Sequence, residues 1–210
     1  MIPPRDHSLP VFIAPRPAAR VAERSVASTP ADDLDTLARA ASAGQTEAMA
    51  ALYDALVRPV YRYVALRVRR REDAEDLTQL VFERIVAGLP RYRHAGRPFQ
   101  AWAFRIARNA VIDHRRRERN HEPLEAGDRQ HHDDGPDVRA LRDEEIAELR
   151  HAMRLLTADQ QEALALRFGG GLSAEEAASV MGRRAGTIRG LTFRAIGALR
   201  RHLADPGEAV

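Results

Sequence analysis

The sequence has 210 residues, a formal net charge of +3 and 44% hydrophobic residues, so one or two small domains with apolar cores are expected. Cysteine is absent, which excludes disulfides and cysteine-ligated zinc. No apolar run approaches the roughly 20 residues that a membrane span needs. We therefore expect a cytoplasmic protein without membrane insertion.

Charge is spread unevenly along the chain. Residues 58–119 hold sixteen arginines and seven acidic residues, and residues 183–201 hold six arginines and no acid. An acidic stretch separates these two basic ones. Such a pattern indicates an elongated polyanionic partner that is touched at two places.

The first 31 residues include six prolines and show little periodicity, so they are expected to form a disordered tail. Apolar residues then recur at helical spacing in three successive stretches. The first begins at Asp32 or Asp33 and ends at Gly44, the second begins near Thr46, and the third spans Arg71 to Gly88. These helices open a domain that we place at residues 32–120.

Acidic residues crowd the start of the third predicted helix, at positions 72, 73, 75 and 76. The helix dipole favours negative charge there, and this accounts for one or two of the four. Four carboxylates in five positions of an otherwise basic domain predict a docking patch for a positively charged partner.

A loop from Tyr92 to Arg97 leads into an amphipathic helix, from Pro98 to Arg119. Its apolar stripe includes Phe99 and Ala103. Trp102 borders this stripe and has two interpretations, a core aromatic or a platform on which a base stacks. The face opposite the stripe is expected to be exposed and carries five arginines, at 105, 108, 115, 116 and 119.

Residues 121–140 read as a flexible acidic linker, in which six acidic residues between Glu122 and Asp137 face one arginine. Its three histidines at 121, 131 and 132 have no further ligands at helical or hairpin spacing, so no metal site is expected.

The second domain, residues 141–204, contains a helix started by the capping box Ser173-Ala-Glu-Glu176 and ended by Gly182. A longer basic helix follows from about Arg184, and this order predicts a helix-turn-helix. The whole chain is therefore expected to be all-α, with two small helical domains.

Several motifs in this order resemble the sigma factors of bacterial RNA polymerase. Asp73-Ala-Glu-Asp-Leu-Thr-Gln79, Phe99-Gln-Ala-Trp102 and Arg105-Ile-Ala-Arg-Asn109 resemble region 2 of the sigma-70 family. Leu156-Thr-Ala-Asp-Gln-Gln161 and Gly171-Leu-Ser-Ala-Glu-Glu176 resemble region 4. Two structured domains without further regions are typical of the extracytoplasmic-function (ECF) group.

This resemblance implies a subunit that binds core RNA polymerase and directs promoter recognition, DNA opening and transcription initiation. It implies contacts with the clamp helices of the largest polymerase subunit, the flap of the second-largest subunit and promoter DNA, and in many members with an anti-sigma factor. The implied polymerase-binding residues are Asp73, Asp76 and Gln79. The implied minus-ten and melting residues are Tyr92, Arg93, Trp102, Arg105, Arg108, Asn109, Arg115, Arg116 and Arg119. The implied minus-thirty-five residues are Arg183, Arg184, Gly186, Thr187, Arg189, Gly190, Phe193 and Arg194.

Two positions depart from the family pattern. Leu80 stands where a glutamate is usual, and Gly190-Leu-Thr-Phe193 replaces a more common Ser-Arg-Leu-His segment. A second interpretation is a helix-turn-helix regulator that binds duplex DNA without polymerase. No phosphate-binding loop, HExxH motif or nucleophile motif supports an enzyme, so neither catalysis nor a cofactor is expected.

Overall fold

The computed structural model describes residues 31–93, 98–121 and 152–204, and all regular structure within them is helical. The prediction of an all-α fold is confirmed. Except for Ala31, which begins the first helix, and His121, which ends the fourth, the expected tail and linker lie outside the described residues. The predicted domain boundaries stay predictions.

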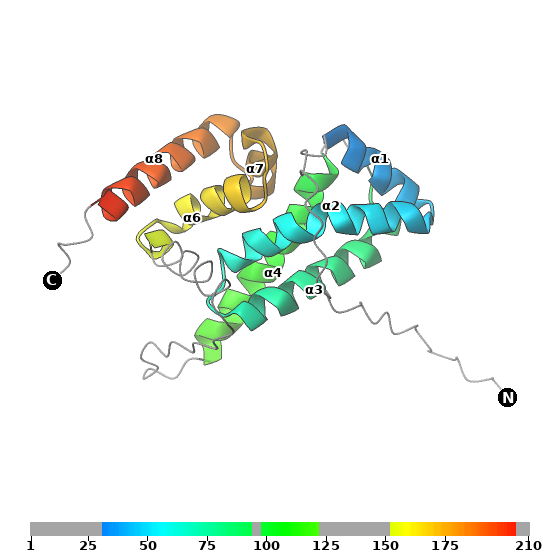
Figure 1. Cartoon of the computed structure of the whole chain (residues 1–210), viewed down its shortest axis with the longest axis horizontal. Coiled ribbons are helices and arrows are strands. Elements are labelled where there is room, and N and C mark those ends of the chain that lie inside the picture. Colours follow the sequence, from blue (N-terminus) through cyan, green and yellow to red (C-terminus); the bar gives the residue numbers. More distant parts are fainter. Residues whose placement is uncertain (1–30, 94–97, 122–151, 205–210) are drawn as a thin grey trace, which may run out of the picture.

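The first domain consists of four helices joined by short connections (Figure 1). They are α1 (Ala31–Ser42), α2 (Thr46–Ala65), α3 (Arg71–Gly88) and α4 (Phe99–His121). A single 3-10 turn, η1 (Leu89–Arg91), follows α3. The predicted apolar stripe of α4 is confirmed, since Phe99, Ala103 and Ala110 are fully buried.

The second domain contains α6 (Ala158–Leu164), the π-helical turn η2 (Ala165–Gly169), α7 (Ala174–Met181) and α8 (Ala185–Ala204). The predicted capping box at Ser173 is present: its hydroxyl accepts from Glu176 N–H, and the Glu176 carboxylate accepts from Ser173 N–H. Gly182 ends α7 with φ +65°, a left-handed conformation that suits glycine. The turn between α7 and α8 therefore forms as the sequence predicts.

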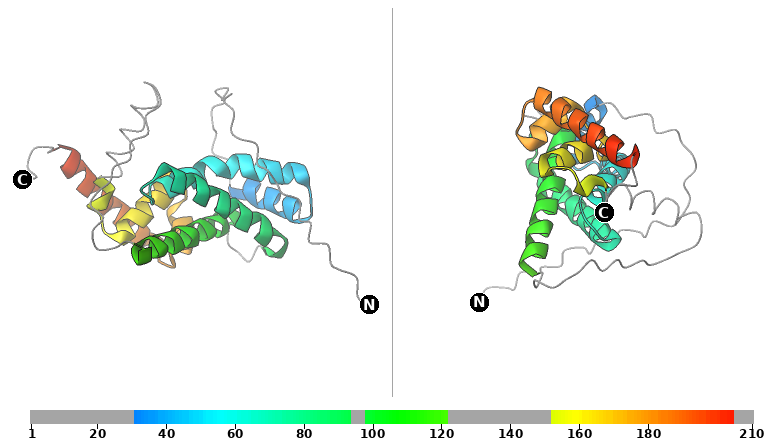
Figure 2. Two further views of the ribbon diagram at one scale, coloured as in Figure 1. Left: turned by 90° about the horizontal axis from the view of Figure 1, so that it is seen from below. Right: turned by 90° about the vertical axis from the view of Figure 1, so that its left-hand side faces the viewer.

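The two domains do not stand apart. Figures 1 and 2 show α6, η2 and α7 lying against α2 and α4, with α8 on the side away from the first domain. Tyr63 of α2 and Phe104 of α4 belong to the same buried cluster as Leu166 of η2 and Leu172 before α7. The helices of both domains thus share one hydrophobic core.

Candidate nucleic-acid and polymerase interface

The acidic start of α3 lies at the surface of the first domain. Asp76 and Gln79 are exposed, and Asp73 is half-buried. Asp73 lies beside His114 of α4, with 3.7 Å between its Oδ2 and His114 Nε2. The three residues that resemble the polymerase-binding motif are therefore on one helix, and two of them are open to a partner.

The face of α4 opposite its apolar stripe has two parts. Arg105, Asn109, Arg116 and Arg119 are exposed, as expected. The expectation is wrong for Arg108 and Arg115, which are half-buried. The physical reason is tertiary: the second domain packs against α4, so part of the basic face is an interface rather than a solvated surface.

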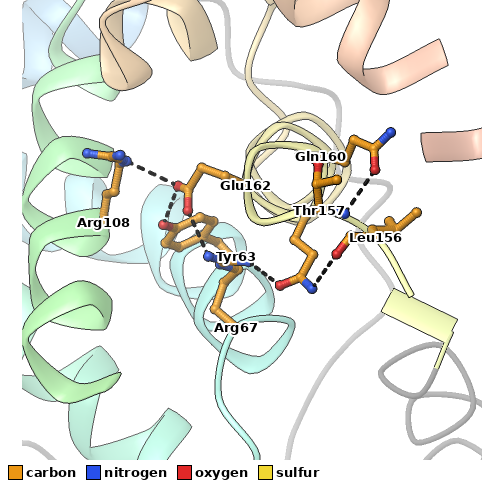
Figure 3. A network of polar contacts seen from close by, with 8 residues as sticks. Tyr63, Arg67, Arg108, Leu156, Thr157, Gln160 and Glu162 are labelled. Atoms are coloured by element: carbon orange, nitrogen blue, oxygen red, sulfur yellow. Dashed lines mark hydrogen bonds and ion pairs between the residues drawn. The ribbon is translucent and has the colours of Figure 1, made fainter. Parts of the chain in front are cut away.

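A buried polar network joins the domains at this interface (Figure 3). Glu162 of α6 is 4% exposed, and its Oε1 accepts a hydrogen bond of 2.8 Å from the Tyr63 hydroxyl. Its Oε2 lies 3.1 Å from the guanidinium of Arg67, which also donates to Gln161 Oε1 at 3.0 Å. Arg108 Nε lies 3.6 Å from Glu162 Oε1. One carboxylate of the second domain therefore holds three side chains of the first.

The network shifts the ionisation of its members. Burial, and then the negative charge of Glu162, raise the pKa of Tyr63 well above its ordinary value, so the phenol stays neutral and donates. Burial, and then repulsion from Arg67, lower the pKa of Arg115. Both shifts follow first from burial at the contact between the two domains, where Arg67 and Arg108 pair with Glu162.

Trp102 lies in an aromatic cluster at the start of α4. Its ring centroid is 5.1 Å from that of Tyr92 and 5.3 Å from that of Phe99. A Cβ on Gly88 would lie 3.0 Å from the indole, so the glycine makes room for it. Trp102 is half-buried, so part of its ring packs within this cluster and part is exposed to solvent.

Asp35 of α1 holds this cluster and the start of α4 in place. Its Oδ1 accepts from the backbone N–H of Phe99 at 2.6 Å, which supplies an acceptor at the N-terminus of α4. It also accepts from the Tyr92 hydroxyl at 3.4 Å. Burial, and then the charge of Asp35, raise the pKa of Tyr92 to about 12. The side chain of Tyr92 is buried, whereas the adjacent Arg93 is exposed.

The surface predicted to bind the minus-thirty-five element, on the outer face of α8 and the turn before it, is exposed to solvent. Phe193 is 81% exposed, and the seven other residues of the predicted set are exposed or half-buried. Arg189 donates to Glu175 of α7 at 2.8 Å, and this hydrogen bond lowers the pKa of that carboxyl. Arg183 donates to Asp159 of α6 at 2.9 Å. These two arginines are therefore oriented by neighbouring carboxylates within their own domain.

One group within the described residues has ligand atoms close enough to hold a cation. His114 Nε2 lies 3.7 Å from Asp73 Oδ2 and 3.6 Å from Glu118 Oε1. All three side chains are partly exposed, and such pairs stabilise helix surfaces without any ion. The arrangement accounts for the half-buried position of Asp73.

Sequence reasoning did not identify Asp35, Arg67 or Glu162 as important. Arg67 and Glu162 lie between 54 and 99 residues from their partners in the other domain, so no local spacing marks them. The available signal was weak: Glu162 and Arg67 are charged residues next to apolar runs.

The fold and these surfaces define a helical protein with two helices that carry exposed arginines, the second of them in a helix-turn-helix. The sigma-70 region 2 family model matches residues 52–121, and the sigma-70 region 4 model matches residues 146–199. The chain is 38% identical over 184 residues to the ECF RNA polymerase sigma factor BldN of Streptomyces coelicolor, which covers 84% of this chain and 70% of BldN. The chain belongs to the ECF group of sigma-70 family RNA polymerase sigma factors.

Solved structures agree with this assignment. CnrH, in complex with the cytosolic domain of CnrY, is 25% identical and matches with a TM-score of 0.63 over 83% of this chain and 99% of CnrH. The sigma factor RpoE of Bartonella quintana, in complex with the anti-sigma factor NepR, is 27% identical with a TM-score of 0.54, over 71% of this chain and 93% of RpoE. Sigma factors are non-catalytic polymerase subunits that direct transcription initiation, and this is the function of the chain. No helix among the described residues is both long and apolar enough to cross a membrane.

Proposed function

We propose that the chain uses three separate surfaces as a polymerase subunit. The acidic face of α3 binds the clamp helices of the largest polymerase subunit, through Asp76, Gln79 and Asp73. The observation that carries this proposal is the exposure of two of these side chains on an acidic helix of an otherwise basic domain. Opposite charge on a partner both steers association and fixes its register.

The two basic helices are the proposed DNA-binding surfaces. On α4, the exposed Arg105, Asn109, Arg116 and Arg119 face the minus-ten element and the melted strand. On α8 and its turn, the exposed Arg184 and Arg194 and the aromatic ring of Phe193 face the minus-thirty-five element. Open space at Gly186, where an added Cβ would meet nothing within 4 Å, supports a close approach of this helix to DNA. The second domain also contacts the flap of the second-largest subunit.

Transcription in vitro tests the function as a whole. Core polymerase is incubated with a library of promoter fragments, with and without the chain, and specific transcripts are mapped. Transcripts that start at defined positions only when the chain is present support the proposal. DNA binding by the chain alone, with no effect on core polymerase, would favour the stand-alone regulator instead.

The docking surface is tested by reversing its charge. The double variant Asp73→Arg, Asp76→Arg should bind core polymerase at least tenfold more weakly in a pull-down titration, because like charges then face each other. The matched control is Glu47→Arg, Asp54→Arg, which makes the same charge change on exposed positions of α2. Equal affinities for the two double variants would refute docking through α3.

The minus-ten surface is tested through the salt dependence of promoter binding by the holoenzyme. Each lost phosphate contact should flatten the slope of log affinity against log salt by about 0.7–0.9. Arg105→Ala with Arg116→Ala should therefore lower the slope by up to about 1.8. We choose these exposed arginines because truncating Arg108 would also disturb Glu162. The control is Arg58→Ala with Arg62→Ala on α2. If both double variants keep the wild-type slope, Arg105 and Arg116 do not contact DNA phosphates.

The partner that regulates the chain is proposed to be an anti-sigma factor, because the similar RpoE is held by one. The site of action is proposed to be the cytoplasm, where core polymerase and promoters are. Co-purification of an endogenous partner with the tagged chain, followed by release of transcription activity when that partner is removed, tests this part.

A further inference from the structure

Three side chains with metal-ligating atoms meet between α3 and α4, which lie side by side (Figures 1 and 2). Asp73 comes from α3, and His114 and Glu118 come from successive turns of α4. One ligand atom of each side chain lies within 4.8 Å of those of the other two. We propose that these three residues bind a Zn²⁺ ion, which ties α3 to α4.

The distances in this cluster are too long for hydrogen bonds and suit the ligands of one ion. An N–H···O hydrogen bond spans about 2.7–3.2 Å. His114 Nε2 lies 3.7 Å from Asp73 Oδ2 and 3.6 Å from Glu118 Oε1. A tetrahedral Zn²⁺ with bonds of about 2.0–2.1 Å places neighbouring ligand atoms about 3.3–3.4 Å apart. Small side-chain rotations therefore bring the three atoms to the geometry that the ion requires.

The imidazole nitrogen at the centre of the cluster lacks a hydrogen-bond partner. His114 Nε2 is shielded from solvent and makes no hydrogen bond to any residue in the described part of the chain. A buried polar atom without a partner costs free energy. The nitrogen of a neutral imidazole is a common Zn²⁺ ligand, so coordination satisfies this atom. The nitrogen therefore points to a cation independently of the two carboxylates.

The charge balance of the cluster also favours a divalent cation. On the same helix as Asp73, the carboxylate of Glu75 has an arginine partner, Arg71, at 2.9 Å. Within residues 31–93, 98–121 and 152–204, by contrast, Asp73 and Glu118 form ion pairs only with His114. Two carboxylates this close repel each other, and one Zn²⁺ ion bound together with a neutral imidazole cancels both negative charges.

The ligand set selects the kind of ion. Mg²⁺ and Ca²⁺ prefer oxygen ligands, whereas imidazole together with carboxylates suits Zn²⁺ and similar first-row ions. All three side chains are partly exposed, so a water molecule can complete the four ligands. Structural zinc sites have four protein ligands and are closed, whereas three protein ligands and a water form an open site. We therefore expect this site to exchange its ion with free Zn²⁺.

A Zn²⁺ ion at this site affects the polymerase-binding surface through Asp73. This consequence, unlike the metal site itself, rests on the proposed function, in which Asp73 helps to bind the clamp helices. The ion neutralises the Asp73 carboxylate and leaves Asp76 and Gln79 exposed. Bound Zn²⁺ should therefore weaken the binding of core polymerase by about two- to fivefold, the range for one exposed ion pair.

Titration calorimetry with zinc chloride and the full-length chain tests the site. His114→Gln and Glu118→Gln each remove one ligand and should weaken the Zn²⁺ affinity by about 10–100-fold or more, since even changes beyond the ligands cost that much. The matched control is His131→Gln with His132→Gln, which removes two histidines of the expected linker and should keep the wild-type affinity. Circular dichroism checks the helices of each variant, and Glu118→Gln carries the test if His114→Gln loses its helical signal.

NMR of the histidine rings identifies the nitrogen that binds. In the ¹⁵N-labelled chain, Zn²⁺ should shift His114 Nε2 before the ring nitrogens of the seven others among the eight histidines. If the His131→Gln, His132→Gln variant loses the affinity and His114→Gln keeps it, the chain binds an adventitious ion only, and the proposal is overturned. Absence of Zn²⁺ binding by wild type would leave two helix-surface ion pairs and would overturn it as well.

Core-polymerase binding separates the metal site from its consequence. The affinity of the chain for core polymerase is measured with and without zinc chloride. Wild type should bind core polymerase more weakly when Zn²⁺ is present, and Glu118→Gln should not respond to the ion. An ion bound at His114 without any change in polymerase affinity would keep the metal site and refute its effect on docking through Asp73.

Discussion

Asp35 is the residue whose removal should most clearly show how α4 is held in place. Its carboxylate is 8% exposed and accepts from Phe99 N–H and from the Tyr92 hydroxyl. The substitution Asp35→Ala removes the oxygen that accepts from both donors. The start of α4, the aromatic cluster around Trp102 and the end of η1 should all lose order together.

The magnitude follows from two contributions. Loss of an acceptor at a helix N-terminus costs about 1 kcal/mol. A buried donor left without its partner costs about 1–3 kcal/mol. The two contributions sum to about 2–4 kcal/mol. Because one side chain provides both contacts, this sum is an upper estimate of the loss in the free energy of unfolding. For a chain of this size a loss of about 2–4 kcal/mol corresponds to a fall in Tm of roughly 4–16 °C.

Thermal and urea unfolding should be followed by circular dichroism at 222 nm, and the environment of Trp102 by near-ultraviolet dichroism. Asp33→Ala is the matched control, because Asp33 is exposed on the same helix and should change stability by about 0.5 kcal/mol or less. Asp35→Asn keeps an acceptor oxygen, so its loss of stability should lie between those of Asp33→Ala and Asp35→Ala. If Asp35→Ala unfolds at the same temperature as Asp33→Ala, the carboxylate does not hold α4, and the reasoning fails.

Two further predictions concern titration and backbone conformation. In an alkaline titration followed at 295 nm, Tyr92 should ionise near pH 12 and Tyr63 well above its ordinary pKa, and Tyr92→Phe should remove the step near pH 12. A raised pKa means that the neutral phenol stabilises the fold, so this stability is complete below about pH 10 and is lost as the pH rises towards 12. A native chain in which all tyrosines ionise near pH 10 would contradict this. Gly182→Ala should lower stability by about 1–2 kcal/mol because of its left-handed conformation, whereas Gly186→Ala, within α8, should be neutral or stabilising by up to about 1 kcal/mol. Equal effects of the two alanines on urea unfolding would rule out strain at Gly182.

Local sequence rules account for much of the fold. Two features of α7 involve only residues close together in the sequence, so they could be predicted from spacing alone. They are the capping box formed by Ser173 and Glu176 and the left-handed conformation of Gly182 at the end of the helix. The buried stripe of α4 follows from helical periodicity in the same way. These signals place the helices but contain no information about which helices from different domains meet.

The joint between the domains could not be predicted for that reason. Glu162 lies 99 residues from Tyr63, and its burial depends on a contact that the sequence does not mark. Periodicity places Arg108 on the polar face of α4, and only the packing of the second domain turns that position into an interface. The proposed surfaces for polymerase and DNA were expected from motifs, whereas the contact between the domains depends on tertiary packing alone.

The π-helical turn η2 affects how the second domain can evolve. In η2 the Gly170 N–H bonds to the Ala165 carbonyl, five residues earlier, instead of four as in an α-helix. The extra residue sets the angular offset between Glu162 before the turn and Gly169 at its end, and both face the first domain. Each residue of an α-helix turns the chain by about 100°, so deletion of a single residue here would carry one of these contacts away from the joint. The length of this short segment is therefore constrained by the contact between the two domains, in addition to the residue types at Gly169 and Gly170.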